Sequence, residues 1–119
     1  PQRYGRVYLI ERSDGSYPLE RRPEKGLLAK TYQFPTTDWC EAKPPSDSPK
    51  SYQKMNVVGK VNHRFSHFAL ELTVIKVDNE SRDIKNIAVP QNGIWKKPNQ
   101  LDQLGLSSLM RKASKYIKV

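Results

Sequence analysis

Two runs of strand-forming residues, Val57 to Asn62 and Ala69 to Val77, constrain the fold of this chain more than any other part of its sequence. Apolar and polar residues alternate along both, which is typical of strands that bury one face. His63 to Phe68 joins them without glycine or proline, so alternation alone allows a strand pair or one long strand. We interpret the two runs as a pair, with Phe68, Leu70, Leu72 and Val74 buried on the second strand and Val57, Val61 and Phe65 on the first.

A second strand pair is predicted near the start of the chain. Arg6 to Glu11 and Tyr17 to Arg22 flank Ser13-Asp14-Gly15-Ser16, where Asp-Gly supplies the positive φ of a tight hairpin. A short extended segment is expected at Tyr32 to Pro35, and Ile94-Trp95 is expected to continue the sheet. We expect the core to include Trp39, Trp95 and Tyr116.

The C-terminal residues predict an amphipathic helix, because their apolar side chains recur at intervals of three and four. Ser107 or Ser108 is the expected N-cap. The inward residues are Leu106, Leu109, Met110, Ala113, Tyr116 and Ile117, and the outward ones are Arg111, Lys112, Lys115 and Lys118.

Many short strands and one secure helix predict an α+β sandwich of mixed or antiparallel sheets rather than a parallel βαβ sheet. At 119 residues, the chain is long enough for one domain, residues 1–119, and too short for two. Three further segments are interpreted as a mobile loop at Lys43 to Lys50, a helical turn at Ser51 to Asn56 and a short strand at Ile84 to Val89.

The net charge of +9 is concentrated at the two ends of the chain. Arg82 to Val119 carries eight basic and two acidic residues, whereas Thr31 to Ser81 carries six of each. This asymmetry favours a polyanionic partner such as nucleic acid. No apolar run approaches the roughly 18 residues that span a bilayer, so no membrane partner is expected. The single cysteine, Cys40, fits an intracellular setting, and the start at Pro1 suggests a piece of a longer protein.

Three separated segments, taken in order, resemble the C-terminal domain of the MutY family, adenine DNA glycosylases that act on adenine mispaired with oxoguanine. The first segment resembles the family's "RRPEKGLL…EFPTTDW" region. It runs from Leu19 to Trp39 and contains LERRPEKGLL and YQFPTTDW. Phe65-Ser66-His67-Phe68 resembles its "FSHF" loop, and LSSLMRK from Leu106 to Lys112 resembles "LPSVMRK". The match spans nearly the whole chain.

The resemblance implies a Nudix-like fold, related to MutT, that recognises oxoguanine while an absent N-terminal catalytic domain of the same chain removes the adenine. Phe65, Ser66 and His67 are the expected recognition residues, with His63 and Arg64 as further DNA contacts. The implied partner is double-stranded DNA containing oxoguanine–adenine mispairs. We expect no cofactor in this part of the chain and an iron–sulfur cluster in the catalytic domain. A monomer in the bacterial cytoplasm, associated with the nucleoid, is expected.

The alternative is a Nudix nucleotide pyrophosphohydrolase, an enzyme in its own right. Such an enzyme needs a helix with an Arg-Glu-x-x-Glu-Glu array to hold Mg²⁺. Between Gly26 and Val57 the sequence offers only Asp38, Glu41 and Asp47, with prolines between the last two. We therefore expect no catalytic residues in this chain, although the parent protein is expected to be a glycosylase.

Two other sites are disfavoured by spacing. His63 and His67 lie four residues apart in a strand and turn rather than on one helical face, so no metal site is expected. Ser66 and His67 would point to opposite faces of a strand, and no acid is spaced to orient the imidazole, which argues against a serine hydrolase.

Overall fold

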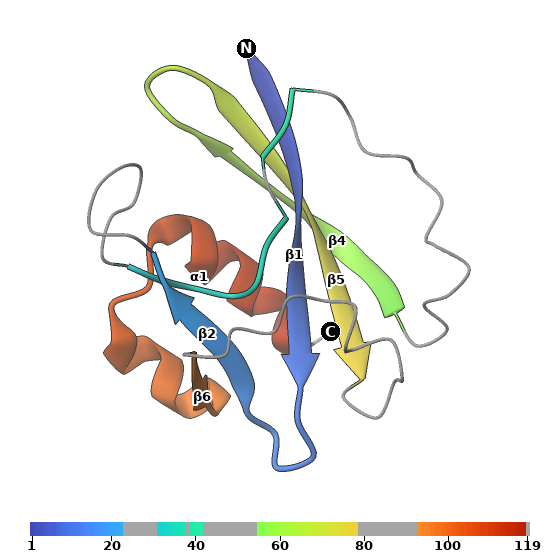
Figure 1. Cartoon of the computed structure of the whole chain (residues 1–119), viewed down its shortest axis with the longest axis vertical. Coiled ribbons are helices and arrows are strands. Elements are labelled where there is room, and N and C mark those ends of the chain that lie inside the picture. The colour runs from blue at the N-terminus through green and yellow to red at the C-terminus, as the bar shows by residue number, and fades with distance from the viewer. Residues whose placement is uncertain (23–30, 38, 42–54, 79–92, 119) are drawn as a thin grey trace.

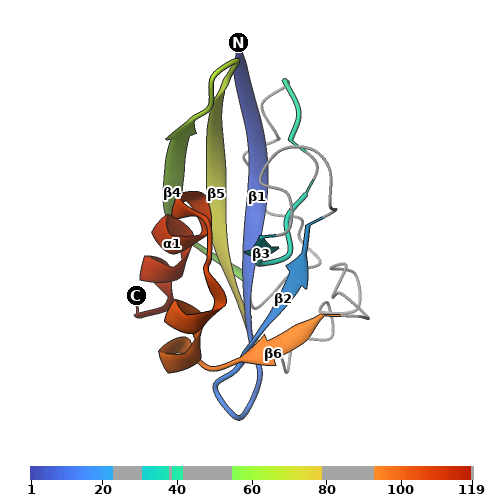
Figure 2. The same cartoon turned by 90° about the vertical axis from the view of Figure 1, so that its left-hand side faces the viewer.

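The computed structural model describes residues 1–22, 31–37, 39–41, 55–78 and 93–118 (Figure 1). They form two three-stranded sheets, and helical segments cover one face of the larger sheet (Figure 2). The α+β class predicted from the sequence is confirmed. The larger sheet has the order β1 (Gln2–Glu11), β5 (Ala69–Asp78), β4 (Met55–Arg64), and the smaller has β3 (Tyr32–Gln33), β2 (Tyr17–Arg21), β6 (Ile94–Lys96).

The predicted strand pair is the antiparallel pair of β4 and β5, in which Arg64 faces Ala69 and Met55 faces Val77. β5 lies in the middle of the larger sheet because its other edge pairs with β1 in parallel over ten residues, from Gln2–Ala69 to Glu11–Asp78. Its side chains Leu70, Leu72 and Val74 are buried, as the alternation predicts.

A β-bulge makes one part of the predicted alternation wrong. Val57 pairs with Ile75 but Gly59 pairs with Val74, so Val58 is the extra residue on β4. A bulge moves the following side chains to the opposite face relative to strict alternation. Val57 is therefore 55% exposed, whereas Val58 packs against the core and Val61 is 3% exposed. The predicted helical turn at Ser51 to Asn56 is also wrong where it is described, because Asn56 lies in β4.

The bulge leads to a matched prediction for two valines on one strand. Val61→Ala should lower the free energy of unfolding by about 1 to 3 kcal/mol, because it removes two buried methyl groups. Val57→Ala should change it by less than about 0.5 kcal/mol, because that side chain is largely in water. Urea denaturation followed by circular dichroism gives both values, and equal costs would contradict the bulge.

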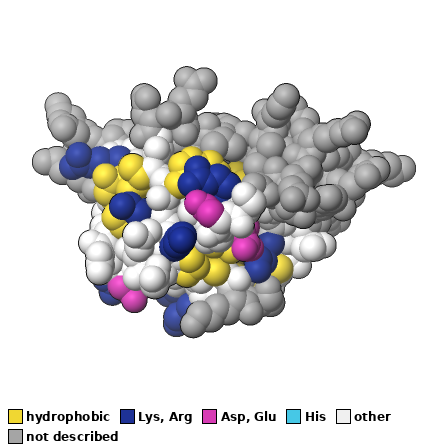
Figure 3. All heavy atoms as spheres, turned by 90° about the horizontal axis from the view of Figure 1, so that it is seen from below, with side chains coloured by type: hydrophobic (Ala, Val, Ile, Leu, Met, Phe, Trp, Pro, Cys, Tyr) yellow, Lys and Arg dark blue, Asp and Glu magenta, His cyan; other side chains and the backbone are white. Residues whose placement is uncertain are grey.

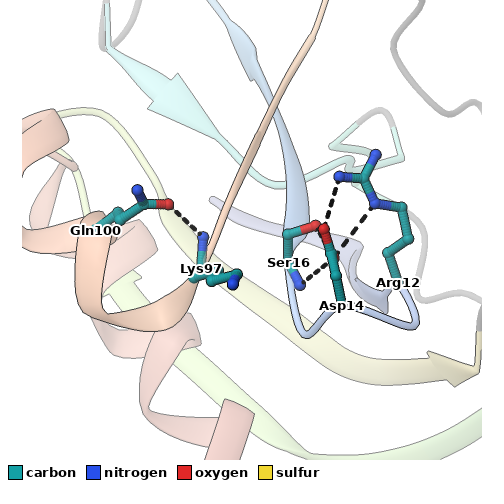
Figure 4. Close-up of polar contacts among 5 residues, drawn as sticks. All are labelled: Arg12, Asp14, Ser16, Lys97 and Gln100. Carbon is teal, nitrogen blue, oxygen red and sulfur yellow. Dashed lines mark hydrogen bonds and ion pairs between the residues drawn. The ribbon is translucent and has the colours of Figure 1, made fainter.

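The turn between β1 and β2 is formed as predicted, but the two strands do not pair with each other. Gly15 has φ +84°, and the Ser16 N–H donates to Asp14 Oδ1 at 3.0 Å (Figure 4). Arg12 Nη2 donates to Asp14 Oδ2 at 3.0 Å. The two strands enter different sheets because β5 takes one edge of β1, while bonds such as that from the Tyr8 N–H to the Pro35 carbonyl (2.9 Å) take the other. The prediction that these two strands pair with each other as a hairpin is thus wrong.

The predicted C-terminal helix is α1 (Ser108–Ser114), and Ser107 is its N-cap, with its hydroxyl accepting from the Met110 N–H at 3.2 Å. The chain continues as the 3₁₀-helix η3 (Lys115–Lys118). The sequence prediction missed a second 3₁₀-helix, η2 (Pro98–Leu104), in which the Lys97 N–H donates to Gln100 Oε1 at 3.0 Å (Figure 4).

The larger of two clusters of buried hydrophobic residues joins the larger sheet, β2 and the helical segments. Trp39 and Tyr116, predicted as core residues, are only partly buried and pack against its edge. Trp95 is half-buried, with the Arg12 guanidinium 4.5 Å above its ring. The buried members are Val7, Leu9, Tyr17, Leu19, Phe34, Val61, Leu70, Leu72, Val74, Leu101, Leu106, Leu109, Met110 and Ala113.

The predictions at Lys43 to Lys50, Ser51 to Lys54 and Ile84 to Val89 lie outside the described residues. In the described part of the chain, no helix is long and apolar enough to cross a bilayer.

Candidate functional site

The loop between β4 and β5 places two polar side chains at the end of the larger sheet that lies opposite the β1–β2 turn (Figure 1). The Phe65 N–H donates to the Phe68 carbonyl at 2.8 Å, which closes a four-residue turn. Ser66 and His67 occupy its two central positions and are exposed, whereas Phe65 and Phe68 are half-buried. The turn therefore presents a hydroxyl and an imidazole to solvent and keeps its aromatic residues against the protein.

Four rings, which we call the aromatic cluster, support this loop: Trp39, His63, Phe65 and Phe68. The Phe65 ring is central. Its centroid lies 4.9 Å from that of Phe68, and the Trp39 ring stacks on it at 5.9 Å with an interplanar angle of 24°. The His63 ring meets it edge-on at 4.7 Å. Offset and edge-on contacts of this kind add to area burial, so the cluster fixes the two ends of the turn.

Trp39 reaches the loop because a glycine on β1 leaves room for it. The segment after Phe34 runs along the outer edge of β1, with an isolated bridge between Tyr4 and Cys40. A Cβ on Gly5 would lie 2.9 Å from Trp39 Cδ1 and 3.0 Å from Leu72 Cδ2. No side chain larger than hydrogen fits without displacing the indole, so Gly5 sets the position of the cluster.

Two arginines lie over the rings of the cluster. The guanidinium carbon of Arg3 is 4.2 Å from the centroid of Phe68, and that of Arg22 is 4.9 Å from the centroid of Trp39. Arg22 also donates to Gln33 Oε1 at 2.6 Å. Cations at these distances are attracted by the ring faces, and they place positive charge beside the loop.

His63 connects the cluster to α1. Lys112 Nζ lies 3.3 Å from His63 Nδ1 and donates to the Asn62 carbonyl at 3.0 Å. Burial lowers the pKa of His63, and the nearby positive charge of Lys112 lowers it further. The His63 imidazole is therefore neutral at neutral pH.

The structure brings together four of the five predicted site residues. His63 and Phe65 stand in the aromatic cluster, with Ser66 and His67 exposed at the tip of the turn. The fifth, Arg64, is exposed and directed to the opposite face of β4 from His63, because successive strand residues alternate.

The sequence analysis missed Arg3, Arg22 and Lys112 and placed Trp39 only in the core. No local pattern could have revealed them, because they come from β1, β2, the segment after Phe34 and α1.

At the end of the molecule that lies opposite the loop, the described basic side chains are dispersed (Figure 3). Figure 3 views the end that carries the β1–β2 turn, and its described Lys and Arg side chains are separated by apolar, acidic and other surface. In the described ranges, no three His, Cys, Asp or Glu side chains gather in a way that could hold a metal ion. Asp38 and Asp47, two of the three acidic residues between Gly26 and Val57, lie outside the described residues.

A family model for the NUDIX domain matches residues 6–116. No curated protein matches the chain.

Solved structures with the same fold include the C-terminal domain of a MUTYH protein and two MutT proteins. The chain aligns over 99% of its length with 88% of the C-terminal domain of mouse MUTYH, solved in complex with human PCNA, at TM-score 0.71 and 19% identity. It aligns over 99% of its length with 94% of the MutT protein from Methanosarcina mazei Go1, at TM-score 0.69 and 14% identity. A MutT NUDIX hydrolase from Burkholderia pseudomallei gives TM-score 0.66 and 18% identity, with 98% of each chain covered. These likenesses establish the Nudix-like fold predicted from the sequence.

Proposed function

This chain belongs to the NUDIX domain family, and we propose that within this family it recognises oxoguanine in DNA as the C-terminal domain of an adenine DNA glycosylase. The observation that carries the proposal is the turn at the end of β4, which exposes Ser66 and His67 on a base of stacked rings. The parent enzyme would remove the adenine opposite the lesion, and this domain would identify its partner base.

The chemistry of the lesion suits this turn. Oxoguanine carries a hydrogen on N7 and a carbonyl at C8, whereas guanine presents an unprotonated N7 acceptor at the same edge. A serine hydroxyl both donates and accepts, so Ser66 can pair with either altered group. Exposed backbone groups of the turn lie next to it. Ser66 together with a backbone group held in a fixed direction can therefore distinguish the N7 donor of oxoguanine from the N7 acceptor of guanine.

Rigidity adds to selectivity because it reduces the ordering cost of binding. The Phe65 ring contacts Trp39, His63 and Phe68, and the Phe65 N–H is bonded across the turn. A side chain held in place before binding loses less conformational freedom when it meets the base. Arg3 and Arg22 bring positive charge beside the turn, which favours an approaching phosphate backbone.

A second candidate, a Nudix nucleotide pyrophosphohydrolase, is favoured by the family model and by the fold of the two MutT proteins. Its weakness is the carboxylate set. Of the three acidic residues between Gly26 and Val57, the structure describes Glu41, which is exposed. Hydrolysis of a pyrophosphate would need several carboxylates gathered on one helix.

Two assays separate the candidates. In the parent enzyme, single-turnover adenine removal from oxoguanine–adenine and guanine–adenine duplexes is compared with and without residues 1–119. Removing this domain should lower the ratio of the two rates by at least about 10-fold, because a few base contacts contribute about 1 to 3 kcal/mol each.

The chain alone is then incubated with nucleoside triphosphates and Mg²⁺, and no turnover is expected. Turnover that disappears in Glu41→Gln would favour the hydrolase. An unchanged rate ratio after deletion would contradict lesion recognition. Binding of the chain alone to duplex DNA is expected to be weak and to fall steeply with salt, with Kd of roughly 10⁻⁴ to 10⁻⁶ M.

A further inference from the structure

Lys112 lies on α1, far from the loop in sequence, and contacts the last residues of β4 before the turn. Its Nζ is 3.0 Å from the Asn62 carbonyl oxygen and 3.3 Å from His63 Nδ1. The helix that carries it is fixed, because Leu109, Met110 and Ala113 on its other face are buried in the core. Lys112 therefore links the rigid body of the protein to the base of the loop.

We infer that Lys112 is a positioning residue for the β4–β5 loop: by holding His63 against Phe65, it keeps Ser66 and His67 in the geometry that meets the base. This inference rests on the proposed function. Lys112 itself need not touch the DNA, since it acts through the backbone of Asn62 and the ring of His63.

The chemistry of the contact defines the state of the His63 ring. A lysine ammonium has three donors and no acceptor, so Nδ1 of His63 must accept and must be unprotonated. The proton of the neutral ring then resides on Nε2. In this state the ring meets Phe65 edge-on at 4.7 Å, and Phe65 in turn stacks on Trp39. A chain of contacts thus runs from α1 to the first residue of the turn.

No other charge described around His63 explains its state. From β5, Leu70 is the residue paired with it, and from the loop, Phe65 packs on its ring. Arg64 follows it on β4 but lies on the opposite face. Lys112 from α1 is the charged group that lowers its pKa, after burial.

A simpler role for Lys112 is attraction of the DNA backbone, since it is exposed on the basic face of α1. Lys115 offers a matched control. It is one turn further along, is exposed and carries the same charge, and no described residue forms a hydrogen bond or ion pair with its ammonium group. Loss of either lysine removes one positive charge from the same face, but only loss of Lys112 removes the contact with His63.

The test compares Lys112→Met with Lys115→Met by two independent measurements. In the chain itself, ¹⁵N NMR of the histidine rings reports the His63 tautomer and its titration. In the wild type and in Lys115→Met, Nδ1 should be unprotonated and Nε2 protonated. In Lys112→Met the two tautomers should mix, and the pKa should rise because a neighbouring positive charge is gone. A residue important only for folding would not produce this signature.

In the parent enzyme, the preference for oxoguanine–adenine over guanine–adenine pairs should fall about 3- to 10-fold in Lys112→Met, in keeping with the loss of one hydrogen bond. It should stay within about 2-fold of wild type in Lys115→Met, because a distant phosphate contact affects both duplexes equally. Melting temperatures of both variants serve as the control for folding.

The outcomes distinguish this inference from the proposed function. If the preference of the parent enzyme for oxoguanine–adenine pairs is the same with and without residues 1–119, the proposed function is overturned. The positioning role of Lys112 is then overturned with it. If the wild type shows the preference but Lys112→Met leaves it unchanged, positioning is overturned and lesion recognition stands, whatever the NMR shows. Equal losses in Lys112→Met and Lys115→Met would likewise overturn positioning, because they would assign both lysines to phosphate contact.

Discussion

Truncation of Leu72 to alanine is expected to lower the free energy of unfolding by about 2 to 5 kcal/mol. Leu72 is 0% exposed and lies on the central strand β5, where it faces Gly5 on one side and Val61 on the other. Both neighbouring strands hold the backbone in place, so the site cannot collapse into the space that the side chain leaves. The expected cost therefore includes a cavity as well as lost hydrophobic burial.

Chemical denaturation with urea, monitored by circular dichroism, measures this cost. Leu72→Met is the matched control, because a volume-conserving apolar replacement costs less than about 1.5 kcal/mol. Equal costs for Leu72→Ala and Leu72→Met would mean that the centre of the sheet is not packed as described. Because Leu72 and Trp39 both lie against Gly5, we also expect near-ultraviolet dichroism of the alanine variant to change.

Joint replacement of Phe65, Ser66 and His67 by alanine is expected to reduce the oxoguanine preference of the parent enzyme by about 10- to 100-fold, since each lost base contact contributes about 1 to 3 kcal/mol. Ser66→Ala alone should have a smaller effect, because water can replace part of a lost hydrogen bond. The measurement is the ratio of single-turnover rates on oxoguanine–adenine and guanine–adenine duplexes.

The structure shows that this triple replacement needs a folding control. Phe65 is half-buried, stacks on Trp39 and lies tilted against Phe68, so its loss should also lower the melting temperature. The double variant Ser66→Ala with His67→Ala avoids this problem, because both side chains are exposed. Its free energy of unfolding should stay within about 0.5 kcal/mol of that of the wild type. The parent enzyme with this double variant should still lose most of its preference for oxoguanine–adenine pairs. If the double variant and the triple variant both keep the wild-type ratio, the loop is a structural turn only.

Local patterns in the sequence predicted the parts of the fold that depend on neighbouring residues. The alternation of Leu70, Leu72 and Val74 predicted the buried face of β5, since side chains of a strand alternate between its faces. Asp14-Gly15 predicted a turn that needs positive φ, and Ser107 predicted the start of α1. The position of the exposed Ser66 and His67 between two strands was likewise evident from the sequence, with the help of a family resemblance.

The contacts between distant segments could be seen only in the folded molecule. The parallel pairing of β1 with β5, the bulge at Val58 and the contacts of Trp39 and Lys112 with the loop all join residues far apart in the chain. Their physical reason is shared burial: a strand joins the edge that hides most apolar surface, and Trp39 occupies the space that Gly5 leaves open. Such contacts depend on the summed packing of the whole molecule. No pattern of a few neighbouring residues encodes them. Local patterns and a family resemblance indicated the loop with Ser66, whereas the packing of the whole molecule determines what holds that loop in place.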